Sequence, residues 1–128
     1  MDGKRVSELR LLPGRYAVCR LDADGGVPEW VTGLFVSVTR TRDELSIVCV
    51  EGLAPEGTKC ENGWRIFQVA GPLEFSLTGI LAAIAVPLAN AEVSIFAVST
   101  FDTDYVLVRE ENLAKAVEAL RVAGHHVL

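Results

Sequence analysis

The sequence has few basic residues, and they are not clustered. Twelve lysines and arginines stand against seventeen aspartates and glutamates among 128 residues, which gives a formal net charge of −5. Binding of nucleic acid requires a clustered basic face that releases counterions from phosphates. The dispersed basic residues therefore predict a protein that does not bind nucleic acid.

The chain also lacks a long hydrophobic run. The longest apolar stretch, 79–91, contains Pro87 and is shorter than the roughly 20 residues that cross a bilayer. The opening residues MDGKR have no apolar core of the kind found in a signal peptide. We therefore expect no membrane partner and a cytoplasmic location.

Cysteine and histidine are scarce. Cys19, Cys49 and Cys60 form no CxxC pair, and none of them lies near a histidine in the sequence. Their odd number and the expected cytoplasmic location argue against a disulfide framework. His125 and His126 are neighbours, and a strand would point them to opposite faces. We expect no disulfide framework, no metal site and no cofactor.

The overall composition is that of a folded protein. Half of the residues are hydrophobic and 23% are charged, which excludes the low hydrophobicity and high charge of a disordered chain. The length suffices for one ordinary domain, or for two very small domains that share a core.

The first half of the chain predicts strands joined by irregular segments. Apolar runs rich in β-branched residues lie between turn-forming residues. Residues 22–26 read as a loop, and 51–63 read as an irregular connection. The predicted strands are 15–21, 34–39, 45–50 and 64–69.

The second half has clearer helical signals. ILAAIAVPLANA follows Gly79 and predicts a helix, although Pro87 removes the hydrogen bond to the Ala83 carbonyl and should bend or loosen the last turn. Strands are expected at 92–99 and 104–109.

A second helix is predicted to begin at an Asn112 cap. Leu113, Val117 and Leu120 would form its buried stripe, and Gly124 would end it. With a last strand at 125–128, the order from Trp64 onward is β-α-β-β-α-β, the ferredoxin-like pattern of an α+β fold.

The two halves contain similar hairpin sequences. Residues 38–48 align with 98–108 at a constant offset of 60, which places Glu44 at the position of Asp104. This repeat predicts a tandem pair of units, a degenerate N-terminal half at 1–63 and a complete C-terminal domain at 64–128. We expect antiparallel sheets with helices on one face, in one compact double unit.

Three stretches resemble the ACT domain family: GPLEFSLTGILAAIA (71–85), VSIFAVSTFDTDYVLV (93–108) and ENLAKAVEALRVAGH (111–125). Within that family, the chain is similar to small tandem ACT proteins related to the regulatory region of aspartate kinase and to a cytosolic arginine sensor. The resemblance implies a ligand, most often an amino acid, bound where two units meet.

The resemblance implies that backbone groups of the first strand-to-helix loop hold the ligand. Here that loop is Leu77, Thr78, Gly79 and Ile80. A helix N-terminus offers free N–H groups and a positive dipole end to a carboxylate, and glycine permits close approach. Alternatively, Gly79 only permits tight packing of the helix on the sheet.

The resemblance places the facing wall of the site in the turn at 100–104. Asp104 matches an acid that meets the cationic end of the ligand in the arginine sensor, and a carboxylate suits a guanidinium or an ammonium. Phe101 would cover an aliphatic stem, and Thr100 and Thr103 would donate hydrogen bonds. Alternatively, Asp102 and Thr103 form a side-chain-bonded turn.

The function expected from these features is that of a regulatory or sensor module with no catalysis of its own. The resemblance also implies pairing through sheet edges or helices, as a homodimer or with a partner protein. A structural interaction domain without a ligand is the alternative. An acylphosphatase-like enzyme is less well supported, because no arginine-bearing phosphate loop precedes Gly79 and no Ser or Cys nucleophile has an evident base.

Overall fold

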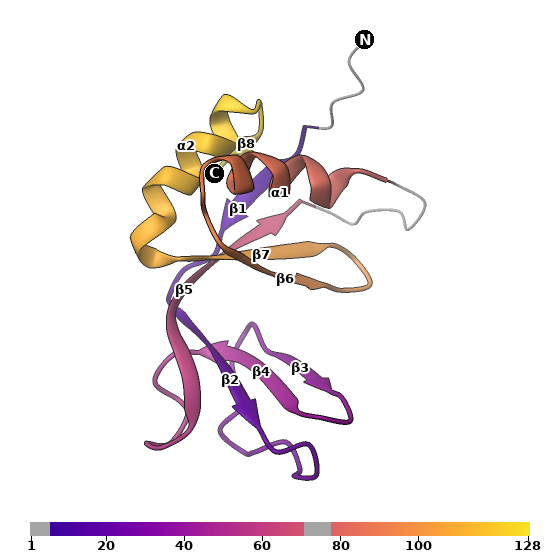
Figure 1. Ribbon diagram of the computed structural model, residues 1–128, viewed down its shortest axis with the longest axis vertical. Helices are drawn as coiled ribbons and strands as arrows, with labels where there is room; N and C mark the ends of the chain where they lie inside the picture. The colour runs from indigo at the N-terminus through magenta and orange to yellow at the C-terminus, as the bar shows by residue number, and fades with distance from the viewer. Residues whose placement is uncertain (1–5, 71–77) are drawn as a thin grey trace. The chain divides into compact units, whose positions relative to one another are not determined.

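The computed structural model describes residues 6–70 and 78–128, and the chain forms two compact units (Figure 1). Met1–Pro13 and Arg65–Leu128 form one unit, which we call the helical unit because it contains both helices. Gly14–Trp64 forms the other, which we call the disulfide unit because it contains a bond between Cys19 and Cys60. Eight strands and two α-helices lie in the described residues, which confirms the predicted α+β class. The division into 1–63 and 64–128 stays a prediction.

The helical unit contains a mixed sheet in the order β8-β1-β5-β7-β6. β1 is antiparallel to β5 and parallel to β8, and β6 is antiparallel to β7. The strands are β1 (Glu8–Leu11), β5 (Lys59–Val69, shared with the other unit), β6 (Ile95–Ser99), β7 (Asp104–Arg109) and β8 (His126–Val127).

The sequence patterns did not predict β1. Its four residues ELRL are too short to show a periodic pattern, and the turn at Pro13 and Gly14 follows closely. The strand forms because β5 and β8 pair with it on both sides, and its Leu9 is fully buried. β1 therefore separates β5 from β8.

Both helices cover one face of this sheet, as predicted (Figure 1). They are α1 (Ile80–Asn90) and α2 (Leu113–Val122). Each fully buried leucine-sized side chain contributes about 1.5–3 kcal/mol relative to exposure. The shared core consists of Leu9, Phe67, Val69, Ile84, Leu88, Val93, Val106, Val108, Ala116 and Leu120.

α2 begins differently from the prediction. A 3₁₀ turn at Glu110–Asn112 precedes it, and the Asn112 side chain makes no capping hydrogen bond, so the predicted side-chain cap is wrong.

Both helices end in the same way, with a left-handed residue after the last turn. That residue is Glu92 (φ 61°) after α1 and Gly124 (φ 99°) after α2.

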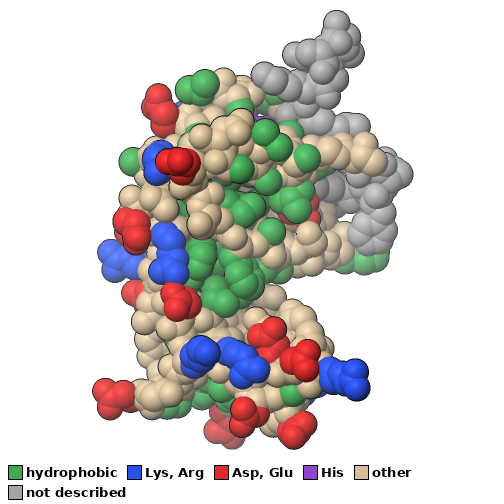
Figure 2. Space-filling view, in the orientation of Figure 1, with side chains coloured by type: hydrophobic (Ala, Val, Ile, Leu, Met, Phe, Trp, Pro, Cys, Tyr) green, Lys and Arg blue, Asp and Glu red, His purple; other side chains and the backbone are tan. Residues whose placement is uncertain are grey.

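α1 carries no charged side chain. Val86, on its outer face, is 55% exposed, and Figure 2 shows hydrophobic side chains at the surface over this helix. α1 remains an α-helix through Pro87 to Asn90. The outer face of α1 is thus apolar and uncharged.

The disulfide unit is an antiparallel sheet in the order β3-β4-β2-β5. Its own strands are β2 (Tyr16–Leu21), β3 (Ser37–Arg40) and β4 (Leu45–Val50). β5 begins at Lys59, so the predicted irregular connection at 51–63 is wrong from residue 59 onward. Its buried core consists of Ala17, Cys19, Leu45, Ile47 and Cys49.

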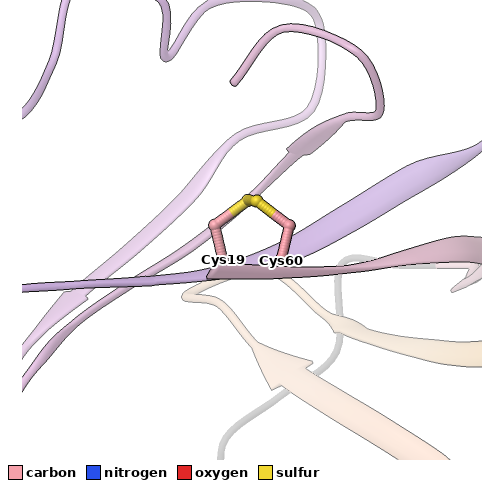
Figure 3. Close-up of a disulfide and its surroundings, with 2 residues drawn as sticks. All are labelled: Cys19 and Cys60. Carbon is pink, nitrogen blue, oxygen red and sulfur yellow. A yellow bond between two sulfur atoms is a disulfide. The ribbon is translucent and has the colours of Figure 1, made fainter. Parts of the chain in front are cut away.

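The expectation that disulfides are absent is wrong for one pair of cysteines. Cys19 on β2 lies directly opposite Cys60 on β5, with 4.1 Å between their Cα atoms, and their sulfurs are bonded (Figure 3). Cys49 is free and buried. The sequence did not reveal this pair because strand pairing brings together cysteines that are 41 residues apart.

Strand register aligns the hairpins β3–β4 and β6–β7 at an offset of 59 rather than 60. Arg40 pairs with Leu45 in the first, and Ser99 pairs with Asp104 in the second. Asp104 therefore corresponds to Leu45, and the match of Glu44 with Asp104 is wrong by one residue. A shift of one residue matters in a strand because it moves every side chain to the other face.

Candidate ligand site at the start of helix α1

Within the described residues, the N-cap position of α1 supplies no side-chain hydrogen bond to the start of the helix. Gly79 occupies the N-cap position with φ 79° and makes no side-chain cap hydrogen bond, and the first turn contains no acidic residue. Its carbonyl accepts the N–H of Ala83 at 2.9 Å. The first N–H groups of a helix have no partner within it, so this end can receive an anionic group.

The structure describes three of the four predicted loop residues. Thr78 and Gly79 are exposed and Ile80 is half-buried, whereas Leu77 lies outside the described residues. A left-handed φ strains any residue with a Cβ, and this explains glycine at position 79 without requiring close packing of helix on sheet. In the described structure, the packing alternative is therefore not needed to explain Gly79.

The β6–β7 turn is held together by Thr100. Its hydroxyl donates to the Thr103 carbonyl at 2.9 Å and accepts the Thr103 N–H at 3.3 Å, and its own N–H donates to the Thr103 carbonyl at 2.8 Å. The side-chain-bonded turn considered for Asp102 and Thr103 is thus made by Thr100. Its hydroxyl is already engaged in the turn.

Thr103 attaches this turn to the end of β5. It is 5% exposed, and its Oγ1 donates to the carbonyl oxygen of Val69 at 2.7 Å. Val69 is the last residue of β5, from which the chain continues toward α1. The β6–β7 turn, the end of β5 and the start of α1 therefore lie at the same end of the helical unit (Figure 1).

Asp104 lies on the face of the sheet that the helices cover. Val106 and Val108, two and four residues further along β7, belong to the core under the helices, and side chains of a strand alternate between faces. Ser99 Oγ donates to Asp104 Oδ1 at 2.6 Å. Among the described residues, Oδ2 of this half-buried carboxylate has no hydrogen-bond partner.

Phe101 and Ser99 also lie on the β6–β7 hairpin. Phe101 at the tip of the turn is 78% exposed. Ser99 was not predicted as part of the site, because the strand at 92–99 was assigned without a register. The pairing of Ser99 with Asp104 across the hairpin is the signal that would have found it.

Within residues 6–70 and 78–128, no group of three or more His, Cys, Asp or Glu side chains is placed to hold a metal ion. In the same residues, no helix has the length and apolar character needed to cross a bilayer.

A family model described as an ACT domain matches residues 59–122, which is half of the chain. The chain belongs to the ACT domain family. A second family model, described as an N-terminal domain, matches residues 14–57. The resemblance inferred from the three stretches is therefore confirmed.

Known proteins similar to this ACT protein include a sensor and two proteins of known structure. The human cytosolic arginine sensor for mTORC1, subunit 1, is 42% identical over 59 residues, which are 45% of this chain and only 18% of the sensor. A crystal structure of an Agrobacterium tumefaciens protein has a TM-score of 0.92 and 42% identity, and covers 97% of this chain and 93% of that chain.

The third is the regulatory subunit of aspartate kinase from Thermus thermophilus. It has a TM-score of 0.65 and 11% identity, over 94% of this chain and 99% of that chain. At this identity the likeness shows a shared fold.

Proposed function

We propose that this ACT protein is a regulatory module that senses a small amino acid and has no catalysis of its own. The observation that carries the proposal is the left-handed, uncapped Gly79 at the start of α1, at the same end of the sheet as Asp104. The human arginine sensor, similar over 59 residues, supports an amino acid as the ligand class.

In the proposed site the carboxylate of the ligand binds the backbone at Thr78, Gly79 and Ile80, with Leu77 adjoining. The positive end of the α1 dipole and its free N–H groups favour an anion there. The ammonium or guanidinium group binds Oδ2 of Asp104, whose Oδ1 is already held by Ser99. Phe101 covers the apolar part of the ligand.

Thr100 and Thr103 support this site as shaping residues. Their hydroxyls bond the Thr103 and Val69 carbonyls, so the two side chains hold the turn against the end of β5. We infer that they position Asp104 and donate no hydrogen bond to the ligand while these contacts persist.

Regulation follows if the ligand has different affinities for two assembly states, because only such a difference shifts a population. The exposed apolar face of α1, around Val86, and the edge strand β6 are available for pairing with a second copy or a partner protein. A homodimer is the assembly that we propose.

A thermal-shift screen of the twenty amino acids against Asp104 and Asp102 variants tests the site. A ligand at one hundred times its Kd stabilises the native protein by about 2.7 kcal/mol. Asp104→Asn removes one charge-assisted contact, worth about 1.5–3 kcal/mol, so we expect binding at least about tenfold weaker. Asp102→Asn is the matched control, since Asp102 is an exposed acid in the same turn, and it should bind normally.

The screen separates this proposal from its alternative. If an amino acid stabilises the parent protein but Asp104→Asn and Asp102→Asn respond equally, the assignment of Asp104 is wrong. If no amino acid stabilises the parent, the sensor proposal fails and a structural interaction domain without a ligand remains.

A further inference from the structure

The helical unit has a polar cavity on the sheet face turned away from its helices. Its volume is about 280 Å³, and it is lined by Glu8, Arg10, Gln68 and Ala70. All four residues belong to β1, to β5 or to the position directly after β5.

Strand register explains why these side chains share a face. Arg10 pairs with Gln68, and the Ala70 N–H donates to the Glu8 carbonyl at 2.9 Å, so the four residues form two adjacent cross-strand pairs. Between them, Leu9 and Val69 point into the core beneath the helices. Side chains alternate along a strand, so the cavity lies on the face opposite to the core and to Asp104.

The cavity presents charges of both signs, two residues apart on β1. Among the described residues, neither the Glu8 nor the Arg10 side chain makes a hydrogen bond or an ion pair. Gln68 Nε2 donates to the Tyr105 hydroxyl at 3.4 Å, which leaves the amide oxygen of Gln68 available as an acceptor. An anionic, a cationic and an amide group thus face one small volume.

We propose that this cavity binds the zwitterionic head group of a small, polar α-amino acid. The guanidinium of Arg10 can receive a carboxylate through two parallel hydrogen bonds, and the carboxylate of Glu8 can accept an ammonium group. Its volume is that of about nine waters at roughly 30 Å³ each, which suits a small amino acid. This site is separate from the one at Gly79 and does not depend on it.

An NMR titration with three matched probes tests the charge requirement. L-Serine carries both charges, ethanolamine lacks the carboxylate, and 3-hydroxypropionate lacks the ammonium group. We expect L-serine to shift the backbone amide signals of Arg10 and Gln68 at millimolar concentration, and each single-charge analogue to bind at least about tenfold more weakly. Equal binding of all three probes, or no shift with L-serine at tens of millimolar, overturns the proposal.

Charge-removing variants identify the residues involved. Arg10→Gln and Glu8→Gln should each weaken L-serine binding about tenfold. Glu118→Gln, on the exposed side of α2, is the matched control and should bind L-serine as the parent does. If the control weakens binding as much as the two variants, the cavity is not the site.

The same spectra distinguish this proposal from the proposed sensor site. Shifts at Gly79 and Ile80 report binding at the start of α1, whereas shifts at Arg10 and Gln68 report binding in the cavity. Shifts at Gly79 alone support the sensor function and overturn the cavity proposal. Shifts at Arg10 and Gln68 alone support the cavity proposal and overturn the proposed sensor site.

Discussion

The Nε2 atom of His125 lies 2.8 Å from the carbonyl oxygen of Ala83. Pro87, four residues after Ala83, has no N–H, so this carbonyl lacks its donor within α1. Nδ1 of His125 accepts the Ser7 N–H at 3.0 Å, which assigns the ring proton to Nε2. A buried histidine, 4% exposed, therefore supplies the hydrogen bond that the proline removes.

A double-mutant cycle measures this replacement. His125→Ala leaves the Ala83 carbonyl and the Ser7 N–H without partners, so we expect the free energy of unfolding to fall by about 2–6 kcal/mol, at about 1–3 kcal/mol for each of the two groups. In a Pro87→Ala background the new N–H satisfies Ala83, and the cost of His125→Ala should be smaller by about 1 kcal/mol. Urea denaturation gives all four values.

The control for this cycle is His126→Ala. His126 is the exposed neighbour, so its removal should change the free energy of unfolding by less than about 0.5 kcal/mol. If His125→Ala costs the same with and without Pro87, the histidine does not replace the missing helical bond.

Glu92 offers a stabilising substitution. It is exposed and left-handed (φ 61°) at the end of α1, where the Val93 N–H bonds the Leu88 carbonyl at 2.9 Å. A residue with a Cβ is strained there by about 1–2 kcal/mol, and glycine offsets part of that gain through its unfolded-state entropy. We expect Glu92→Gly to raise the free energy of unfolding by about 0.5–1 kcal/mol, while Glu92→Ala, which keeps the Cβ, changes little. Equal effects of the two would count against the strain explanation.

The Cys19–Cys60 bond should contribute strongly to stability. The chain-entropy model gives about 4 kcal/mol for a bond between residues 41 apart. We expect the Cys19→Ala/Cys60→Ala variant to lose about that much in guanidinium denaturation. When reductant is added, the free energy of unfolding of the parent should fall toward that of the variant, and the value for the variant should not change. Three titratable thiols in the unfolded parent without reductant would contradict the bond.

The free thiol predicts a dependence on alkaline pH. Burial raises the pKa of the Cys49 thiol above its ordinary value of 9.0. As pH rises, the unfolded chain releases this proton before the native protein does, so the unfolded state binds fewer protons and the free energy of unfolding falls above about pH 9. Cys49→Ala has no thiol to titrate, so only the parent loses this stabilisation as the pH rises. The difference in free energy of unfolding between the parent and Cys49→Ala should therefore become smaller between about pH 8 and about pH 10. A constant difference would mean that Cys49 does not contribute.

Local sequence signals predicted much of the second half of the chain. The helix after Gly79 and the strand at 104–109 were found because alanine, leucine and β-branched residues follow the periods of those elements. β1 was not predicted because four residues are too few to show a periodic hydrophobic pattern. They form a strand because they pair with β5 and β8.

The candidate site was predictable as a set of positions but not as a set of contacts. The helix start and the β6–β7 turn were named from the resemblance. The sequence did not show that Thr103 bonds Val69 or that Ser99 bonds Asp104, because the first contact depends on strand packing and the second on hairpin register. The roles of Gly79 and Asp104 in binding stay predictions.

The α+β class, both helices and the carbonyl that Pro87 leaves without a donor can be predicted from the sequence, because they depend on residues a few positions apart. The contacts between residues far apart in the sequence depend on the folded sheets. His125 and Ala83 are 42 residues apart and Cys19 and Cys60 are 41, and no local pattern specifies such pairs. They form because the sheets fix strand order and register, and burial then requires each polar group to find a partner.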